Sequence, residues 1–101
     1  LINNEGDAYY NHQLVGKWKL TDDGNGKAEN GLTIYHSDGT CELTADKSGK
    51  KYTWKLAPGD SVILRTIVQT GFEQKWKIRK LTESTLEVGH FRMAMTFTRV
   101  P

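Results

Sequence analysis

The chain has 101 residues and a mass of 11.4 kDa, the size of one small domain rather than two. Hydrophobic residues make up 37% of it and charged residues 26%, enough apolar material for a core and too little net charge for a disordered protein. A formal charge of only +2 argues against a dedicated nucleic-acid binder. The single cysteine, Cys41, excludes an intramolecular disulfide and a multi-cysteine zinc site.

The N-terminal part differs in character from the rest of the chain. Residues 1–12 are polar after their first two positions and show no clear period, so we expect an arm there and a single domain over residues 13–101. Because the first residue is Leu1 rather than Met, we expect that a segment preceded it, such as a signal peptide or a lipid anchor that would tether the protein to a membrane. No run approaches the roughly 20 apolar residues of a transmembrane segment.

Apolar and polar residues alternate along most of the domain, and turn residues interrupt the alternation about every 8–12 positions. This pattern is typical of strands that have one buried and one solvated face. The segment 62–69 is apolar at both parities, which fits a strand covered on both faces. In the other segments the alternation assigns these residues to the inner face: Gly16, Trp18, Leu20, Leu32, Ile34, Cys41, Leu43, Ala45, Tyr52, Trp54, Leu56, Trp76, Ile78, Leu86, Val88, Met93, Met95 and Phe97.

About eight short strands follow one another in this pattern, joined by short turns such as 37–39 and 46–49. The connections leave no room for crossover helices, so neighbouring strands should be antiparallel. An open meander of this length would expose two edges, which favours an all-β, up-and-down barrel that closes on itself. A splayed sheet or a sandwich with the same strand order would also fit most of the alternation.

The first predicted strand opens with Gly16 and Trp18, and Arg99 lies near the C-terminus on the same parity as Met95 and Phe97. This combination resembles the Gly-x-Trp opening and the C-terminal arginine of the lipocalins and the wider calycin group. The segments 32–40 and 76–81 are similar to short bacterial lipocalin-like domains of the cell envelope or of secreted proteins. The resemblance implies a lipocalin-like barrel in which Arg99 packs over Trp18 as a closure device, and it implies a location in the envelope or outside the cell.

The sequence contains no Gly-x-Ser-x-Gly, His-Glu-x-x-His or Cys-x-x-Cys motif, so we predict no catalytic residue, no metal site and no cofactor. Asp22, Asp23 and Asn25 lack the distal glutamate of a calcium loop and are better explained as a turn. His36 and His90 share the parity of inward residues and could hold a metal or titrate near neutral pH, although ordinary strand-end residues are the commoner case.

Aromatic and sulfur-containing side chains dominate the predicted inner face. An eight-stranded barrel can be packed solid or can hold one small ligand, so these residues either fill the interior or line a pocket. Arg65 and Arg92 would suit a barrel mouth, and exposed positions explain them equally well. The candidate ligand-binding residues are Tyr52, Trp54, Trp76, Met93, Met95 and Phe97.

Three classes of function fit these features. The first hypothesis is a non-enzymatic lipocalin-like domain that takes a small apolar or amphipathic ligand at the barrel mouth. The alternative is an interaction module of the cell envelope with a filled barrel, which a large apolar surface patch would favour. An enzyme inside the barrel is the least favoured, because the sequence shows no convergent titratable groups. A connected cavity of several hundred Å³ that opens at one end would favour the first hypothesis over the second.

Overall fold

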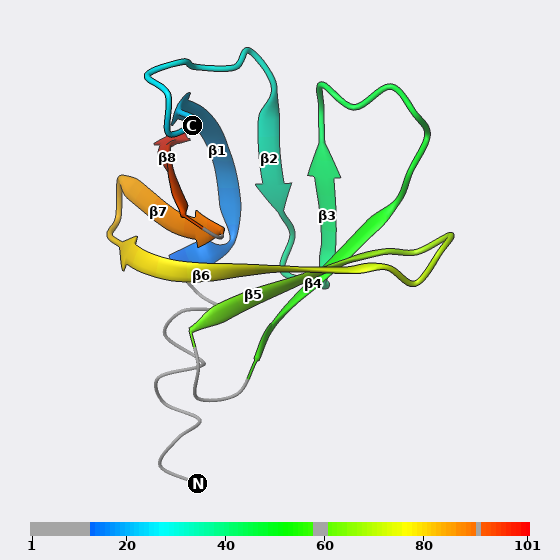
Figure 1. Ribbon diagram of the computed structural model, residues 1–101. Coiled ribbons are helices and arrows are strands. Elements are labelled where there is room, and N and C mark those ends of the chain that lie inside the picture. The colour runs from blue at the N-terminus through cyan, green and yellow to red at the C-terminus, as the bar shows by residue number, and fades with distance from the viewer. Residues whose placement is uncertain (1–12, 58–60, 91) are drawn as a thin grey trace, which may run out of the picture.

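The computed structural model describes residues 13–57, 61–90 and 92–101, apart from the side chain of His90. The predicted N-terminal arm, residues 1–12, therefore lies outside the described residues. Eight strands follow one another along the chain (Figure 1). They are β1 (Gly16–Asp22), β2 (Leu32–Tyr35), β3 (Thr40–Leu43), β4 (Tyr52–Ala57), β5 (Val62–Ile67), β6 (Glu73–Leu81), β7 (Thr85–His90) and β8 (Met93–Val100).

Each strand pairs antiparallel with the next, and β1 also pairs with β8, so the sheet closes into a barrel. The prediction of an all-β barrel of eight antiparallel strands is confirmed. The β3–β4 contact is the shortest, with only two register pairs, Thr40 with Thr53 and Cys41 with Tyr52. Beyond these pairs the two strands separate into a long connection (Figure 1). No helix within the described ranges is long and apolar enough to cross a bilayer.

The turns follow from their sequences. In the β2–β3 turn Asp38 accepts hydrogen bonds from the backbone nitrogen and the hydroxyl of Thr40, and Gly39 has a φ of +91°, a conformation that glycine adopts without strain. After β1, the Oδ1 atom of Asp22 accepts hydrogen bonds from the backbone nitrogens of Gly24 and Gly26. Asp22, the first residue of the segment compared with a calcium loop, therefore stabilises a turn. No group of three or more potential metal ligands occurs among the described residues.

Half of the predicted inner-face residues are buried, and one strand is reversed. Leu32 and Ile34 were expected to point inward, and for Ile34 this expectation is wrong. Ile34 pairs with Lys17 on one side and Glu42 on the other, while the next residue, Tyr35, is buried. The inner face of β2 therefore carries Thr33 and Tyr35, because successive side chains of an extended strand point to opposite faces. Leu32, at the beginning of the strand, shares the parity of Ile34 and pairs with Lys19, yet it borders the cavity at the open end of the barrel.

The strand β5 also has one inner face rather than two covered ones. Ile63 and Ile67 are buried, and Arg65 lies between them at the same parity. Leu64 points to the other face, since its neighbours in the sheet are Lys55 on β4 and Lys75 on β6. This parity brings the charged side chain of Arg65 to the inside of the barrel.

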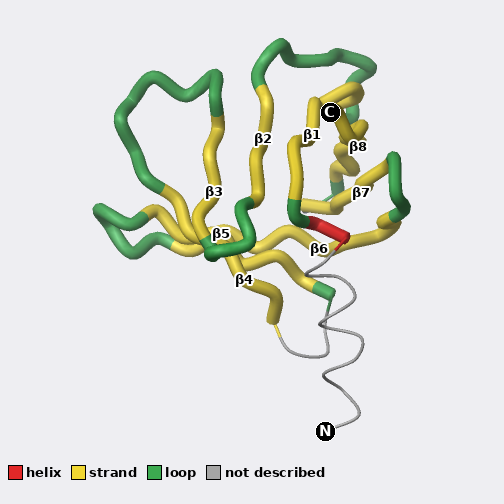
Figure 2. The backbone as a smooth tube through the Cα atoms, turned by 180° about the vertical axis from the view of Figure 1, so that it is seen from behind, coloured by secondary structure: helices red, strands yellow, loops and turns green. Residues whose placement is uncertain are grey.

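One end of the barrel is closed around Trp18, whose side chain is fully buried. Gln13 and Leu14, which are helical (Figure 2), lead into β1, and the indole nitrogen of Trp18 donates to the carbonyl of Leu14 over 2.9 Å. The guanidinium carbon of Arg99 lies 4.3 Å from the centre of the Trp18 ring, which is a cation–π stack.

The Arg99 guanidinium also bonds three backbone carbonyls, those of Gln13, Val15 and Glu83. A Cβ atom at Gly16 would collide with it, and the φ of Gly16 is +143°, so glycine suits this position on both counts. These contacts join β8 and the β6–β7 turn to the segment before β1, and so they lock the seam at which the sheet closes.

Candidate functional site

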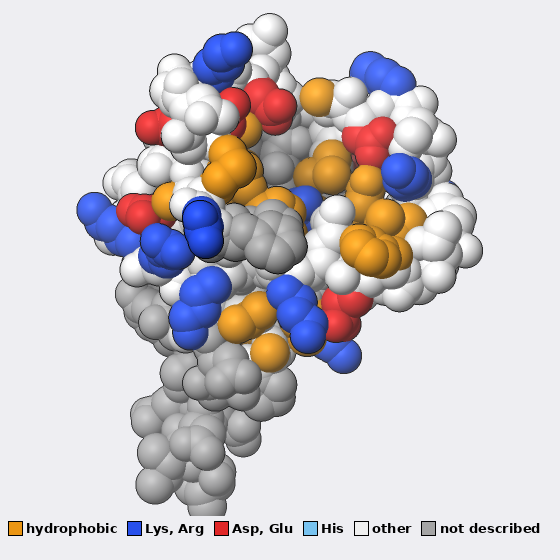
Figure 3. Space-filling view, viewed as in Figure 1, with side chains coloured by type: hydrophobic (Ala, Val, Ile, Leu, Met, Phe, Trp, Pro, Cys, Tyr) orange, Lys and Arg blue, Asp and Glu red, His pale blue; other side chains and the backbone are white. Residues whose placement is uncertain are grey.

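A cavity of about 370 Å³ occupies the other half of the barrel and is open to solvent. Exposed residues of the β1–β2 and β3–β4 connections, Glu29 and Ala45, lie at its mouth together with Asp46. Figure 3 shows hydrophobic side chains gathered around a hollow near the middle of the face in view. The cavity is lined by Leu20, Glu29, Gly31, Leu32, Thr33, Tyr35, Leu43, Ala45, Asp46, Arg65, Trp76, Val88, Met95 and Phe97.

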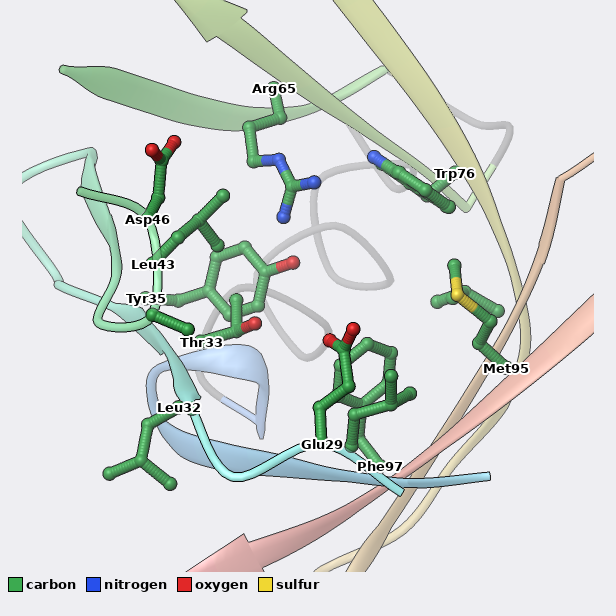
Figure 4. A pocket seen from close by; sticks show the side chains of 14 residues that line it. Glu29, Leu32, Thr33, Tyr35, Leu43, Asp46, Arg65, Trp76, Met95 and Phe97 are labelled. Carbon is green, nitrogen blue, oxygen red and sulfur yellow. The ribbon is translucent and has the colours of Figure 1, made fainter. Parts of the chain in front are cut away.

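The six predicted ligand-binding residues divide into three groups. Trp76, Met95 and Phe97 line the cavity and come from β6 and β8 (Figure 4). Tyr52 and Trp54 are buried in the core, outside the cavity lining. Met93 is 45% exposed and lies against Gly24.

Trp54 is held in the core by directed contacts. Its indole nitrogen donates to the carbonyl of His36 over 2.9 Å, and its ring meets that of Tyr35 edge to face at 5.4 Å. The first contact satisfies the buried N–H group, and the second packs β4 against β2. Trp54 therefore supports the wall behind Tyr35, which does line the cavity.

The polar groups of the cavity centre on Arg65 (Figure 4). Its Nε atom donates to the side-chain oxygen of Gln74 over 2.9 Å. Its guanidinium carbon lies 5.2 Å from the ring centre of Trp76 and 5.7 Å from that of Tyr52. Among the described residues no carboxylate forms an ion pair with it. Arg65 thus brings a cation into a largely apolar cavity, supported by one amide and two aromatic rings.

Two further polar side chains adjoin Arg65 on the inner wall. Burial raises the pKa of Tyr35 well above its ordinary value, although the charge of Arg65 and a hydrogen bond with its guanidinium oppose the rise. Burial likewise raises the pKa of the Cys41 thiol to about 11. Both groups are therefore protonated and neutral at physiological pH, so Cys41 is not a thiolate nucleophile and Tyr35 is a neutral hydroxyl.

His36, the histidine whose side chain the structure describes, does not join these groups. His36 is partly exposed, and its Nε2 atom lies 2.5 Å from a carboxylate oxygen of Glu42 at the surface. The side chain of His90 lies outside the described residues. Arg92, the other candidate charge for a barrel mouth, is exposed and does not line the cavity.

Tyr35 and Thr33 were not predicted from the sequence, and the prediction for Arg65 was ambiguous. Tyr35 was missed because Leu32 and Ile34 are the more hydrophobic pair on the opposite parity. For Arg65 a signal exists, since it shares its parity with Ile63 and Ile67. Because Val62, Leu64 and Val68 make the opposite parity equally apolar, this signal alone does not select the inner face of β5.

Asp46 joins the mouth of the cavity to the barrel wall. Its Oδ2 atom accepts a hydrogen bond from the Tyr52 hydroxyl over 2.7 Å, and its Oδ1 atom accepts one from the backbone nitrogen of Ser48 over 2.8 Å. Hydrogen bonds from Ser48 and Tyr52 lower the pKa of Asp46 from 3.8 to about 2. The ionised carboxylate thus fastens the start of the β3–β4 connection next to the shortest seam of the sheet.

Acid should loosen this contact. A carboxyl group whose pKa is lower in the folded than in the unfolded state stabilises the fold above its unfolded pKa, and this contribution is lost as the pH falls toward its folded pKa. For Asp46 the loss should run from about pH 4 to about pH 2. We expect the urea midpoint of wild type to fall more steeply over this range than that of Asp46→Asn. Tyr52→Phe, which removes one donor, should be intermediate, and equal slopes in wild type and Asp46→Asn would refute the assignment.

Comparison of the chain with protein-family models, with curated proteins and with solved structures found no match.

Proposed function

We propose that the protein is a non-enzymatic binding domain that takes one small amphipathic ligand into the open end of its barrel. The observation that carries the proposal is the open cavity of about 370 Å³. Ligand pockets in proteins typically measure about 300–1,000 Å³ and combine apolar walls with a few convergent polar groups. Leu20, Met95 and Phe97 supply such walls here, and Arg65 and Tyr35 supply the polar groups.

The resemblance of Gly16, Trp18 and Arg99 to the lipocalin pattern supports the same proposal. In such a domain one end is closed and rigid and the other receives the ligand. The contacts of Arg99 with Trp18 close one end, while the cavity opens near Glu29 and Ala45. The proposed place of action, the cell envelope or the extracellular space, rests on the resemblance alone.

An interaction module with a filled barrel remains the alternative proposal, and one observation favours it. Val68 and Phe72, which lie in the turn between β5 and β6, are 54% and 61% exposed. Two exposed side chains make a smaller surface than a stable protein interface usually requires. The cavity accounts for more of the structure, and we therefore rank ligand binding first.

A pair of tryptophan substitutions on neighbouring residues of β3 tests the proposal. Leu43 lines the cavity, whereas Glu42 is exposed on the outer face. We expect Leu43→Trp to block the cavity and to weaken binding of the uncharged fluorescent probe N-phenyl-1-naphthylamine roughly tenfold or more, a loss of about 1.4 kcal/mol. Glu42→Trp introduces the same side chain on the other face and should bind the probe as wild type does.

The readout is the emission of the probe, which rises in an apolar environment, during titration with each protein. Circular dichroism establishes that both variants keep the β fold. Equal probe affinities for the two variants would contradict a site inside the barrel. Failure of wild type to bind the probe or any other small amphiphile would overturn the proposed function.

A further inference from the structure

The charge inside the cavity specifies which amphipathic ligand it should accept. We infer that the ligand carries a carboxylate, which enters first and binds Arg65 and Tyr35, while its apolar part lies toward the mouth. This inference rests on the proposed function and deepens it. It follows from the position of Arg65, from the donors around it and from the charges at the mouth.

A guanidinium in an apolar cavity is costly unless an anion or several acceptors compensate it. Arg65 donates through Nε to Gln74, and among the described residues no carboxylate forms an ion pair with it. In Figure 4 the end of its guanidinium group points into the cavity, toward the hydroxyl of Tyr35. The outer edge of the guanidinium is thus directed at the space that a ligand would fill.

The shape of these donors favours a carboxylate. A guanidinium is a planar fork whose two parallel N–H groups match the two oxygens of a carboxylate, and such charge-assisted pairs are the stronger hydrogen bonds in proteins. Tyr35 is neutral, so its hydroxyl can accept a hydrogen bond from Arg65 and donate its own proton to a ligand oxygen. Arg65 and Tyr35 together therefore offer donors from two directions.

The charges at the mouth set the orientation. Glu29 and Asp46 place acidic side chains at the entrance, whereas the guanidinium of Arg65 lies inside the cavity. An anionic head that stayed at the mouth would be repelled by these carboxylates, and one that entered would meet Arg65. In this orientation the apolar part of the ligand contacts Met95 and Phe97, and Phe97 lies across the cavity from Arg65 (Figure 4).

The test compares three ligands that share one alkyl chain and differ only in the head: decanoate, decanol and decylamine, each below its aggregation concentration. Isothermal titration and displacement of N-phenyl-1-naphthylamine give the affinities. We expect wild type to bind decanoate roughly 10- to 100-fold more tightly than decanol, the effect of a charge-assisted hydrogen-bonded pair, and decylamine most weakly.

Variants assign the preference to the two residues. Arg65→Met keeps the length of the side chain without its charge and should remove the preference for decanoate while retaining the neutral probe. Tyr35→Phe should reduce the preference for decanoate over decanol by roughly three- to tenfold. Lys55→Gln removes an exposed cation from the neighbouring strand β4 and should leave all affinities unchanged.

The outcomes separate the inference from the proposed function. Wild type could bind the neutral probe and decanol without preferring decanoate, and Arg65→Met could leave the affinities unchanged. In that case the carboxylate inference is overturned and the binding function stands. If wild type binds none of these compounds, both are overturned. The comparison of decanoate with decanol on wild type decides the inference even if Arg65→Met fails to fold.

Discussion

Replacing Trp18 with alanine is expected to lower the free energy of unfolding by about 3–5 kcal/mol, which is a large part of the total stability of a small domain. Trp18 is fully buried, its indole nitrogen bonds the carbonyl of Leu14, and its ring lies under Arg99. Alanine would leave a cavity in the closed end, an unpaired carbonyl and a guanidinium without its aromatic support. Urea unfolding followed by circular dichroism measures the loss.

Trp76→Ala is the matched control, because it deletes the same side chain at a partly buried position that lines the open cavity. We expect a smaller loss of stability there, since much of the Trp76 surface faces space that is already empty. Trp18→Phe, which keeps a ring for Arg99 to stack on, should fold even if Trp18→Ala does not. A loss at Trp18 no larger than that at Trp76 would show that the closed end is not the stabilising part of the barrel.

Replacing Arg99 with methionine is expected to cost about 2–4 kcal/mol, because the partly buried carbonyls of Gln13 and Val15 lose their donors. The carbonyl of Glu83 loses its donor too, but it lies in an exposed turn and can bond water. Arg99→Lys keeps the charge, yet an ammonium cannot reproduce the planar fork over Trp18, so we expect it to recover only part of the stability.

A double-mutant cycle of Arg99→Met with Trp18→Leu, which removes the ring, isolates the stacking contribution, for which we expect a coupling of about 0.5–2 kcal/mol. Arg92→Met, an exposed arginine just before β8, is the control and should change the free energy of unfolding little. Additive effects of the two substitutions in the cycle would contradict a stabilising stack between the residues.

The two ends of the barrel therefore serve different purposes in this interpretation. The closed end holds Trp18, the largest fully buried side chain among the described residues, together with the Arg99 contacts, and it supplies rigidity. The open end contains the cavity, the shortest strand pairing and the Asp46 contact that acid should weaken. Because the two regions are separate, substitutions at the closed end should act mainly on stability and substitutions at Arg65 mainly on ligand preference.

The sequence by itself determined the approximate number and the order of the strands, since alternation with a period of two, interrupted by turn residues at regular intervals, is typical of successive short strands. It also indicated the buried faces of β1, β4 and β7, where one parity is plainly more apolar than the other. The resemblance pointed to Arg99 as the partner of Trp18. These features depend on residues close in the chain or on a pattern already associated with this fold.

The tertiary structure alone decided the face of β2, the position of Arg65 and the presence of the cavity. On β2 and β5 both parities carry apolar side chains, so only pairing with the neighbouring strands selects Tyr35 and Arg65 for the interior. The cavity depends on how the sheet closes and on how completely inward side chains from different strands fill the interior. No local sequence pattern predicts the volume of the cavity, because this volume depends on side chains that meet only in the folded barrel.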